Sequence, residues 1–216
     1  MNESLRDAVF RANKMLPRLG LVTMHSGNVS AYDPASDLIY IKPSGVDYDL
    51  LTPEMIVVVK RDGMETLPNQ LLPSVDLVHH HFLYSHMGGV FSIVHTHSNF
   101  ATAFAACELP IPCVLTAVAD EFGGSIPCAP YASHEADNIG KSVLAHRGHG
   151  PAILLGKHGV IAWGEKPEAA VKAAAMVEDV AKTVWLARFM GPLTELPASD
   201  IALWNDRYQR RYGQDK

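Results

Sequence analysis

Neighbouring strand patterns, joined by a turn too short to hold a helix, constrain the fold of this chain most strongly. The segments NVSAYD (28–33), LIYI (38–41) and MIVVVK (55–60) are each typical of a strand. Only a DPASD turn connects the first two, and parallel strands need a crossover of a dozen or more residues. A purely parallel, doubly wound sheet is therefore disfavoured.

Helical patterns alternate with these strands. Apolar residues at Leu5, Val9, Ala12 and Leu16 predict a helix that Pro17 and Gly20 end. Further helices are predicted from an N-cap at Ser74 to Gly88, from an N-cap at Asn99, over 135–148 and over 168–190, and further strands over 90–97 and 152–164. We expect an α/β fold of the α+β type, with one domain over 1–216 and a mixed or mostly antiparallel sheet layered between helices.

Composition excludes several classes of function. The 216 residues are 48% hydrophobic and carry a formal net charge of -5, with Lys and Arg scattered, so a nucleic-acid partner is not expected. The N-terminus lacks the pattern of a signal peptide, and no apolar run is long enough to span a bilayer, so we expect a cytoplasmic protein without a membrane partner. Three cysteines without CxxC spacing predict no disulfide framework, so a metal would depend on His and carboxylates.

Two histidines stand one residue apart in SIVHTHS (92–98). On a strand, His95 and His97 point to the same side about 7 Å apart, which suits two ligands of one metal ion, although polar residues at a strand end are also common. The best candidate for a third ligand is His158, in the tight GKHG turn. The run His79–His81 lies on a predicted helix, and we interpret it as helix surface and interface.

Three separate segments have the composition of an anion site. HSGNVS offers exposed backbone N–H groups, KPSG offers a cation and a hydroxyl, and the predicted helix at Ser74 offers a positive N-terminus. Each segment alone is also an ordinary turn sequence. The candidate phosphate ligands are Gly27, Asn28, Lys42, Ser44, Gly45 and Ser74.

The whole chain resembles the class II aldolase and L-ribulose-5-phosphate 4-epimerase family. The resemblance is carried, in family order, by SGNVS (26–30), IKPSGVDYDLLTPEMIVVV (41–59), PSVD (73–76), IVHTHS (93–98), ADEFGGSIPCAPYA (119–132) and KHGVIAWG (157–164). It implies a sugar-phosphate substrate, Zn²⁺ (or Mn²⁺) held by His95, His97 and His158 with Asp76 beside it, and a homotetramer with active sites at subunit interfaces.

Within the family, the resemblance is closest to the epimerases. They resemble one another in an aspartate after the PS motif, here Asp76, in an ADxxxG segment, here with Asp120, and in a YGQ ending, here with Tyr212. This implies that Asp120 and Tyr212 act as acid and base on opposite faces of the substrate, and that the C-terminal helix and tail (about 199–216) pack at a subunit interface. By themselves, the two aspartates are typical helix or turn caps.

Two departures from the epimerase pattern keep other functions open. Val75 replaces a second serine, which removes a phosphate contact, and the segment before the YGQ ending is shorter, with Arg207 and Tyr208 near the place of an expected histidine. The alternatives are an aldolase of the L-fuculose-1-phosphate type and, from another class, a non-catalytic scaffold like the adducin head domain. A zinc hydrolase is disfavoured because the chain has no HExxH motif.

Overall fold

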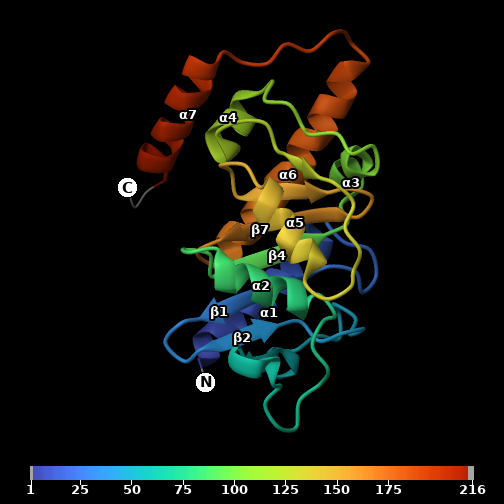
Figure 1. Ribbon diagram of the computed structural model, residues 1–216, viewed down its shortest axis with the longest axis vertical. Coiled ribbons are helices and arrows are strands. Elements are labelled where there is room, and N and C mark those ends of the chain that lie inside the picture. Colours follow the sequence, from blue (N-terminus) through green and yellow to red (C-terminus); the bar gives the residue numbers. More distant parts are fainter. Residues whose placement is uncertain (1, 214–216) are drawn as a thin grey trace.

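A seven-stranded sheet forms the centre of the computed structural model, which describes residues 2–213 (Figure 1). The strand order is β3-β2-β1-β4-β7-β6-β5, and every neighbouring pair is antiparallel except β5 and β6. The strands are β1 (Asn28–Asp33), β2 (Leu38–Ile41), β3 (Val57–Lys60), β4 (Ser92–Thr96), β5 (Cys128–Ala129), β6 (Ala152–Leu155) and β7 (Gly159–Gly164). This confirms the expected mixed sheet.

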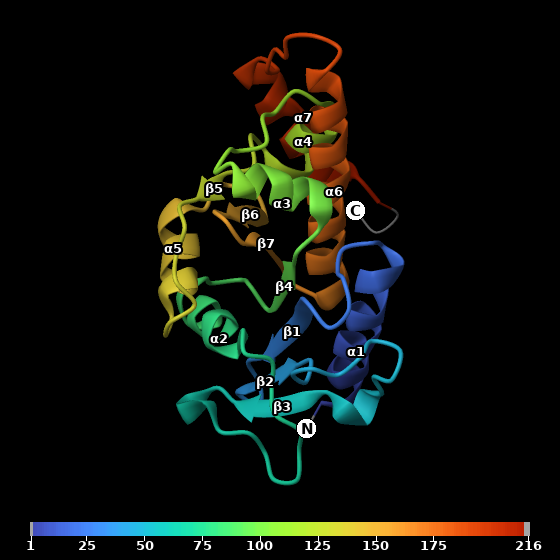
Figure 2. The same cartoon turned by 90° about the vertical axis from the view of Figure 1, so that its right-hand side faces the viewer.

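Helices cover both faces of the sheet (Figure 2). They are α1 (Glu3–Arg18), α2 (Leu77–His86), α3 (Asn99–Ala106), α4 (Thr116–Phe122), α5 (Asn138–His146), α6 (Pro167–Arg188) and α7 (Ala198–Arg211). Alternate residues of β4 show the layering, because Ile93 packs with α2 and α5 whereas Val94 packs with α1, α3 and α6. The single-domain α/β layering predicted from the sequence is confirmed.

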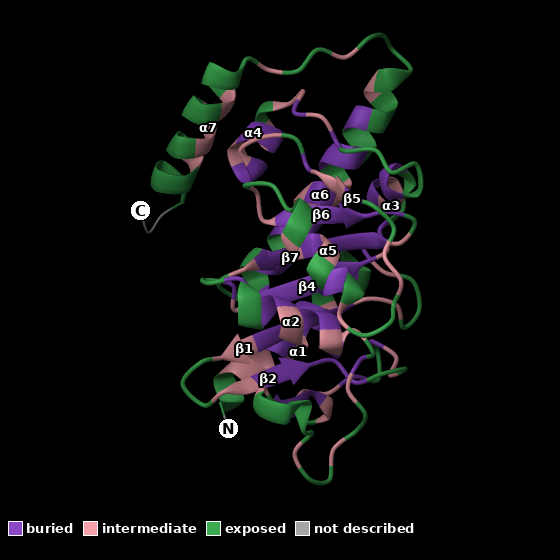
Figure 3. Ribbon diagram, in the orientation of Figure 1, coloured by how far each residue is buried: buried purple, intermediate pink, exposed green. Residues whose placement is uncertain are grey.

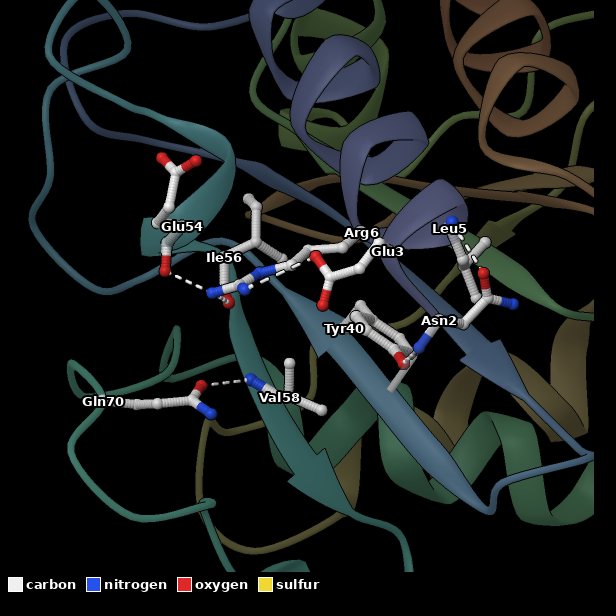
Figure 4. Close-up of polar contacts among 9 residues, drawn as sticks. All are labelled: Asn2, Glu3, Leu5, Arg6, Tyr40, Glu54, Ile56, Val58 and Gln70. Carbon is white, nitrogen blue, oxygen red and sulfur yellow. Dashed lines mark hydrogen bonds and ion pairs between the residues drawn. The ribbon is translucent and has the colours of Figure 1, made fainter.

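Polar contacts fix α1 against the outer strands (Figure 4). The Arg6 guanidinium donates to the carbonyl oxygens of Glu54 and Ile56, and the Asn2 backbone N–H donates to the Tyr40 hydroxyl at 2.7 Å. The side chain of Asn2 also accepts from the Leu5 N–H, so it caps the helix. These contacts hold α1 on one face of β1 and β2.

Several predicted helix boundaries are wrong. Pro17 lies inside α1, which continues to Arg18. Ser74 does not cap α2, because the chain makes one more turn and Asp76 occupies the N-cap position, and α3 begins at Asn99 with Ser98 as its N-cap. At the start of α2, Ser74 and Asp76 both bond to the side chain of Asn28 and neither makes a side-chain capping bond.

The histidine run on α2 also differs from its interpretation as a surface feature. His79 and His80 are buried, with 3% and 0% of their surface exposed, because α2 packs against the sheet, where Nδ1 of His80 lies 2.7 Å from Oγ of Ser30, and against α5 beside it. The central strands are likewise buried, whereas much of α7 is exposed (Figure 3). No helix in the described part of the chain is long and apolar enough to cross a membrane.

Candidate metal and substrate site

The three histidines predicted as metal ligands lie together at one end of β4 and β7. One ring nitrogen from each of His95, His97 and His158 forms a group whose atoms all lie within 4.8 Å of one another. Nε2 of His95 is 2.9 Å from Nε2 of His97, and the ring centroid of His158 is 4.7 Å from that of His95. The antiparallel pairing of β4 with β7 brings the turn with His158 beside the HxH pair.

The chemical state of these rings fits a divalent metal ion. Nδ1 of His95 donates to the Val160 carbonyl oxygen at 2.9 Å, so Nε2 is the nitrogen of this ring that can offer a lone pair to a metal. Burial and the neighbouring histidines lower the pKa of His97 to about 4 and that of His158 to about 3, so both rings are neutral at pH 7. Nδ1 of His158 is buried without a hydrogen-bond partner. Metal binding itself stays a prediction.

Glycine allows the close approach of backbone to these rings. A Cβ on Gly159 would lie 2.8 Å from Cδ2 of His97, and would also collide with the Thr96 carbonyl oxygen. Gly27 has φ +72°, and a Cβ there would lie 2.7 Å from the His95 carbonyl oxygen. The two segments that carry these glycines can therefore flank the end of β4 only because they lack side chains at these positions.

Asp76 lies in the same cavity, although its carboxylate is not within the group of three ring nitrogens. Its Oδ2 accepts a hydrogen bond from Nδ2 of Asn28 at 2.6 Å, and the same amide donates to Oγ of Ser74 at 3.1 Å. Burial alone would raise the pKa of Asp76, but the nearby His95 and His80 and the Asn28 amide lower it below its ordinary value. Asp76 is therefore a carboxylate, held facing the histidine side of the cavity.

Lys42 is the buried cation of the site. Only 1% of its surface is exposed, and none of residues 2–213 forms an ion pair with it. Its Nζ donates to the Val46 carbonyl oxygen at 2.7 Å and lies 4.7 Å from the centre of the Tyr48 ring. Burial lowers the pKa of Lys42, so an anion bound beside it would offset its desolvation.

One cavity of about 220 Å³ joins the histidines to nearly all of the predicted phosphate ligands. The candidates that line it are Gly27, Lys42, Ser44, Gly45 and Ser74, and Asn28 lies beneath it, in contact with Ser74 and Asp76. The backbone of Ser44 is held through its N–H to the Leu72 carbonyl oxygen, at 2.9 Å. Val75, which stands in place of a serine, also lines the cavity.

Two further histidines line this cavity and were not predicted as site residues. His25 precedes the SGN segment, and His134 lies 4.5 Å from His158 between ring centroids. Neither residue belongs to a motif with characteristic spacing. His25 begins the HSGNVS segment predicted as part of an anion site, although the histidine itself was not singled out. The position of His134 follows from the pairing of distant segments, so the sequence contains no local signal for it.

Asp120 and Tyr212 line a different cavity, of about 450 Å³, between α4 and α7. Asn205 on α7 donates from Nδ2 to the carbonyl oxygens of Ala119 and Asp120, at 3.2 and 2.9 Å, which docks α7 on α4. Burial raises the pKa of Asp120, and the nearby Arg207 partly opposes this. Asp120 lies inside α4 and is therefore not a cap, while Gln214 of the YGQ ending lies outside the described residues.

Tyr212 and the histidine group lie at opposite ends of β7. His158 precedes the first residue of this strand, whereas its last residue, Gly164, lines a cavity together with Tyr208 and Tyr212. A rise of about 3.4 Å per residue places the ends of the strand roughly 17 Å apart. Within one chain, Tyr212 is therefore too distant to act on a substrate bound at the histidines.

Comparison with known proteins agrees with this architecture. The family described as "Class II Aldolase and Adducin N-terminal domain" matches residues 7–185. The chain belongs to this family, and it is an enzyme of the class II aldolase superfamily.

Solved structures of this superfamily superpose over almost the whole chain. An L-fuculose 1-phosphate aldolase is 25% identical with a TM-score of 0.87, and the alignment covers 97% of this chain and 98% of that one. YgbL from Escherichia coli is 26% identical with a TM-score of 0.77, covering 94% and 98%. The L-fuculose-1-phosphate aldolase from Thermus thermophilus is 25% identical with a TM-score of 0.69, covering 88% and 98%.

Proposed function

We propose that this protein is a metal-dependent epimerase that interconverts L-ribulose 5-phosphate and D-xylulose 5-phosphate. The reaction breaks the C3–C4 bond of the ketose, turns the resulting aldehyde over, and forms the bond again on its other face. The observation that carries the proposal is the shared cavity of Asp120 and Tyr212, because inversion requires two acid/base groups where simple cleavage does not.

His95, His97 and His158 would hold the metal, which we propose to be zinc, with manganese as the alternative. An ion held there supplies a Lewis acid that stabilises the negative charge left on the ketose when the bond breaks. Asp76, held by Asn28, faces this charge from beside the histidines, and we assign it the orientation of the substrate hydroxyls or the transfer of a proton.

Binding of the phosphate is assigned to the residues on the β1 side of the cavity. The buried Lys42 supplies the charge, and the hydroxyls of Ser44 and Ser74 and the backbone at Gly27 and Gly45 supply hydrogen bonds. Asn28 keeps Ser74 and Asp76 in place. These groups fix the substrate at one end, so that the carbon–carbon bond to be broken lies near the histidines.

The proton transfers are assigned to Asp120 and Tyr212 of a second subunit. One group removes the proton of the C4 hydroxyl as the bond breaks, and the other returns a proton to the C4 oxygen after the aldehyde has turned. Because Tyr212 and the histidines of one chain lie at opposite ends of β7, the proposal requires a homo-oligomer, which we propose to be a tetramer. In this assembly we propose that the C-terminal helix and tail, about 199–216, pack at the subunit interface.

A second candidate function is an aldolase that cleaves a ketose 1-phosphate into dihydroxyacetone phosphate and an aldehyde. Two observations favour it. One is the similarity to an L-fuculose 1-phosphate aldolase over nearly the full length of both chains, and the other is the presence of Val75 in the phosphate region.

One assay separates the two functions. The zinc-loaded protein is incubated with L-ribulose 5-phosphate and, separately, with L-fuculose 1-phosphate, with and without chelator. We expect D-xylulose 5-phosphate to form from the first substrate, and to be lost on chelation. Release of dihydroxyacetone phosphate from the second substrate, without conversion of the first, would replace the epimerase by the aldolase.

A further inference from the structure

His134 extends the row of imidazoles beyond the proposed metal ligands. Its ring centroid lies 4.5 Å from that of His158, with the two ring planes inclined at 58°, and it lines the same cavity. Its nitrogens are not part of the group of ligand atoms within 4.8 Å. Among residues 2–213, none forms a hydrogen bond with the His134 ring, so both of its nitrogens remain available to a bound molecule.

The order of the strands places His134 and the phosphate residues on opposite sides of the histidine group. β4, which leads to His95 and His97, has β1 on one side and β7 on the other. Asn28 of β1 pairs with His95, so the Gly27 region lies on the β1 side. His134 follows β5, at the far edge beyond β7 and β6.

The loop that carries His134 is tied to the turn that carries His158. The Gly156 N–H donates to the Ala129 carbonyl oxygen at 2.8 Å, which joins the end of β5 to the GKHG turn. Further along the loop, Nδ2 of Asn138 donates to Oγ of Ser133 at 3.0 Å, which fixes the start of α5 against it. The segment that carries His134 is therefore tied at both ends, to the turn of His158 and to the start of α5.

We propose that His134 determines substrate specificity by hydrogen-bonding the hydroxyl at the end of the sugar that carries no phosphate. The inference rests on the proposed function for the orientation of the substrate, with phosphate on the β1 side. For a pentulose 5-phosphate this end is the C1 hydroxyl. A neutral imidazole offers one donor and one acceptor, which matches a hydroxyl and not a methyl group. A site that hydrogen-bonds a hydroxyl binds an analogue without that hydroxyl less tightly.

The test compares two unreactive ligands, xylitol 5-phosphate and its 1-deoxy analogue, which have no carbonyl group and cannot be cleaved. Their dissociation constants are measured by calorimetry on the zinc-loaded protein and on His134→Phe and His134→Gln. We expect the wild-type protein to prefer the hydroxylated ligand about tenfold, which is the upper range for one neutral hydrogen bond. We expect this ratio to fall close to one in His134→Phe, and to be largely kept in His134→Gln, which retains a donor and an acceptor.

An unchanged ratio in His134→Phe, or no preference in the wild-type protein, would overturn the inference. Zinc content is measured in each variant, and we expect it to be equal to wild type, because His134 is outside the ligand group. Turnover of L-ribulose 5-phosphate is measured in parallel. If the affinity ratio falls as expected but the protein does not turn over L-ribulose 5-phosphate, the epimerase is refuted and the role of His134 stands. If the protein turns over L-ribulose 5-phosphate but the ratio does not fall, the role of His134 is refuted and the epimerase stands.

Discussion

The carboxylate of Glu178 accepts the backbone N–H of Phe100, at 3.0 Å, and its second oxygen accepts that of Ala101 at 2.9 Å. Glu178 lies in the middle of α6, and α3 begins two residues after His97. The N-cap residue of α3, Ser98, makes no side-chain capping bond. A carboxylate from a distant helix thus satisfies the free N–H groups of α3 and fixes the chain that leaves the HxH pair.

Replacing Glu178 by Gln should therefore loosen the segment after His97. An amide offers only one acceptor oxygen and no charge, so we expect a loss of about 1 to 2 kcal/mol in the free energy of unfolding, as for other lost caps. Denaturant titration measures the loss. Asp179→Asn, at an exposed neighbouring position with no ion pair among the described residues, is the matched control. Equal stability of the two variants would show that this cap contributes nothing.

Removal of one histidine should separate metal binding from folding. His97→Asn takes away one of three ring nitrogens that lie within 4.8 Å of one another, so we expect the zinc content to fall from about one per chain to near zero. Elemental analysis after dialysis measures this. The exposed His149, which is outside the group, provides the control His149→Asn. Full zinc content in His97→Asn would exclude the ring from the ligand set.

A methyl group at Gly159 should disturb the same ring sterically. The added Cβ would lie 2.8 Å from Cδ2 of His97, and it would also collide with the Thr96 carbonyl oxygen, which belongs to the backbone of the paired strand. We expect Gly159→Ala to lose about 1 to 3 kcal/mol of stability, as for overpacking elsewhere, together with zinc affinity. Gly88→Ala is the control, because a Cβ there meets nothing within 4 Å. A Gly159→Ala protein with normal stability and zinc affinity would contradict the close packing at this point.

The parts of the fold with a local pattern are those that the sequence predicts well. The strands 28–33 and 38–41 have the predicted boundaries, because alternation and turn residues act locally. Burial of His79 and His80 could not be predicted, since it depends on how α2 packs against the sheet and against α5 beside it. The place of His134 likewise depends on the pairing of β5 with β6, and the separation of Tyr212 from His158 depends on which end of β7 receives α7.

The buried His80 should make the fold sensitive to acid. Complete burial lowers its pKa to about 3, and its Nδ1 lies 2.7 Å from Oγ of Ser30. In the unfolded chain, a histidine takes up a proton near pH 6.5. Between these two pH values the unfolded state binds more protons than the folded state. The contribution of the neutral His80 to the free energy of unfolding is therefore fully present above pH 6.5. It falls as the pH is lowered towards 3, by up to about 1.4 kcal/mol per pH unit for one group.

Urea titrations between pH 4 and pH 7, with chelator present, measure this slope. We expect His80→Gln to be less stable than wild type at pH 7, but to lose stability less steeply as the pH falls. His149→Gln, at an exposed position, should keep the wild-type slope. Identical slopes for wild type and His80→Gln would mean that this histidine does not contribute to acid unfolding.

Mixing of subunits should test whether Tyr212 acts in the neighbouring active site. Tyr212 has 65% of its surface exposed, and it lies at the end of β7 remote from His158. We expect Tyr212→Phe to keep its zinc and lose most epimerisation, and His97→Asn to lose both. Neither variant alone has a complete site, but a mixed oligomer can combine His97 of one chain with Tyr212 of another.

Coexpression of the two variants with different affinity tags allows the mixed oligomers to be isolated. Random pairing of equal amounts should restore about a quarter of the wild-type activity per chain, because one site in four then receives both intact residues. A double variant, with both changes in one chain, coexpressed with the wild-type protein controls for simple dilution. The mixed oligomers could instead remain as inactive as the separate variants, with the wild-type oligomeric state kept in all samples. In that case Tyr212 would not complete a neighbouring site, and the second acid/base group would have to be sought among residues of the same chain.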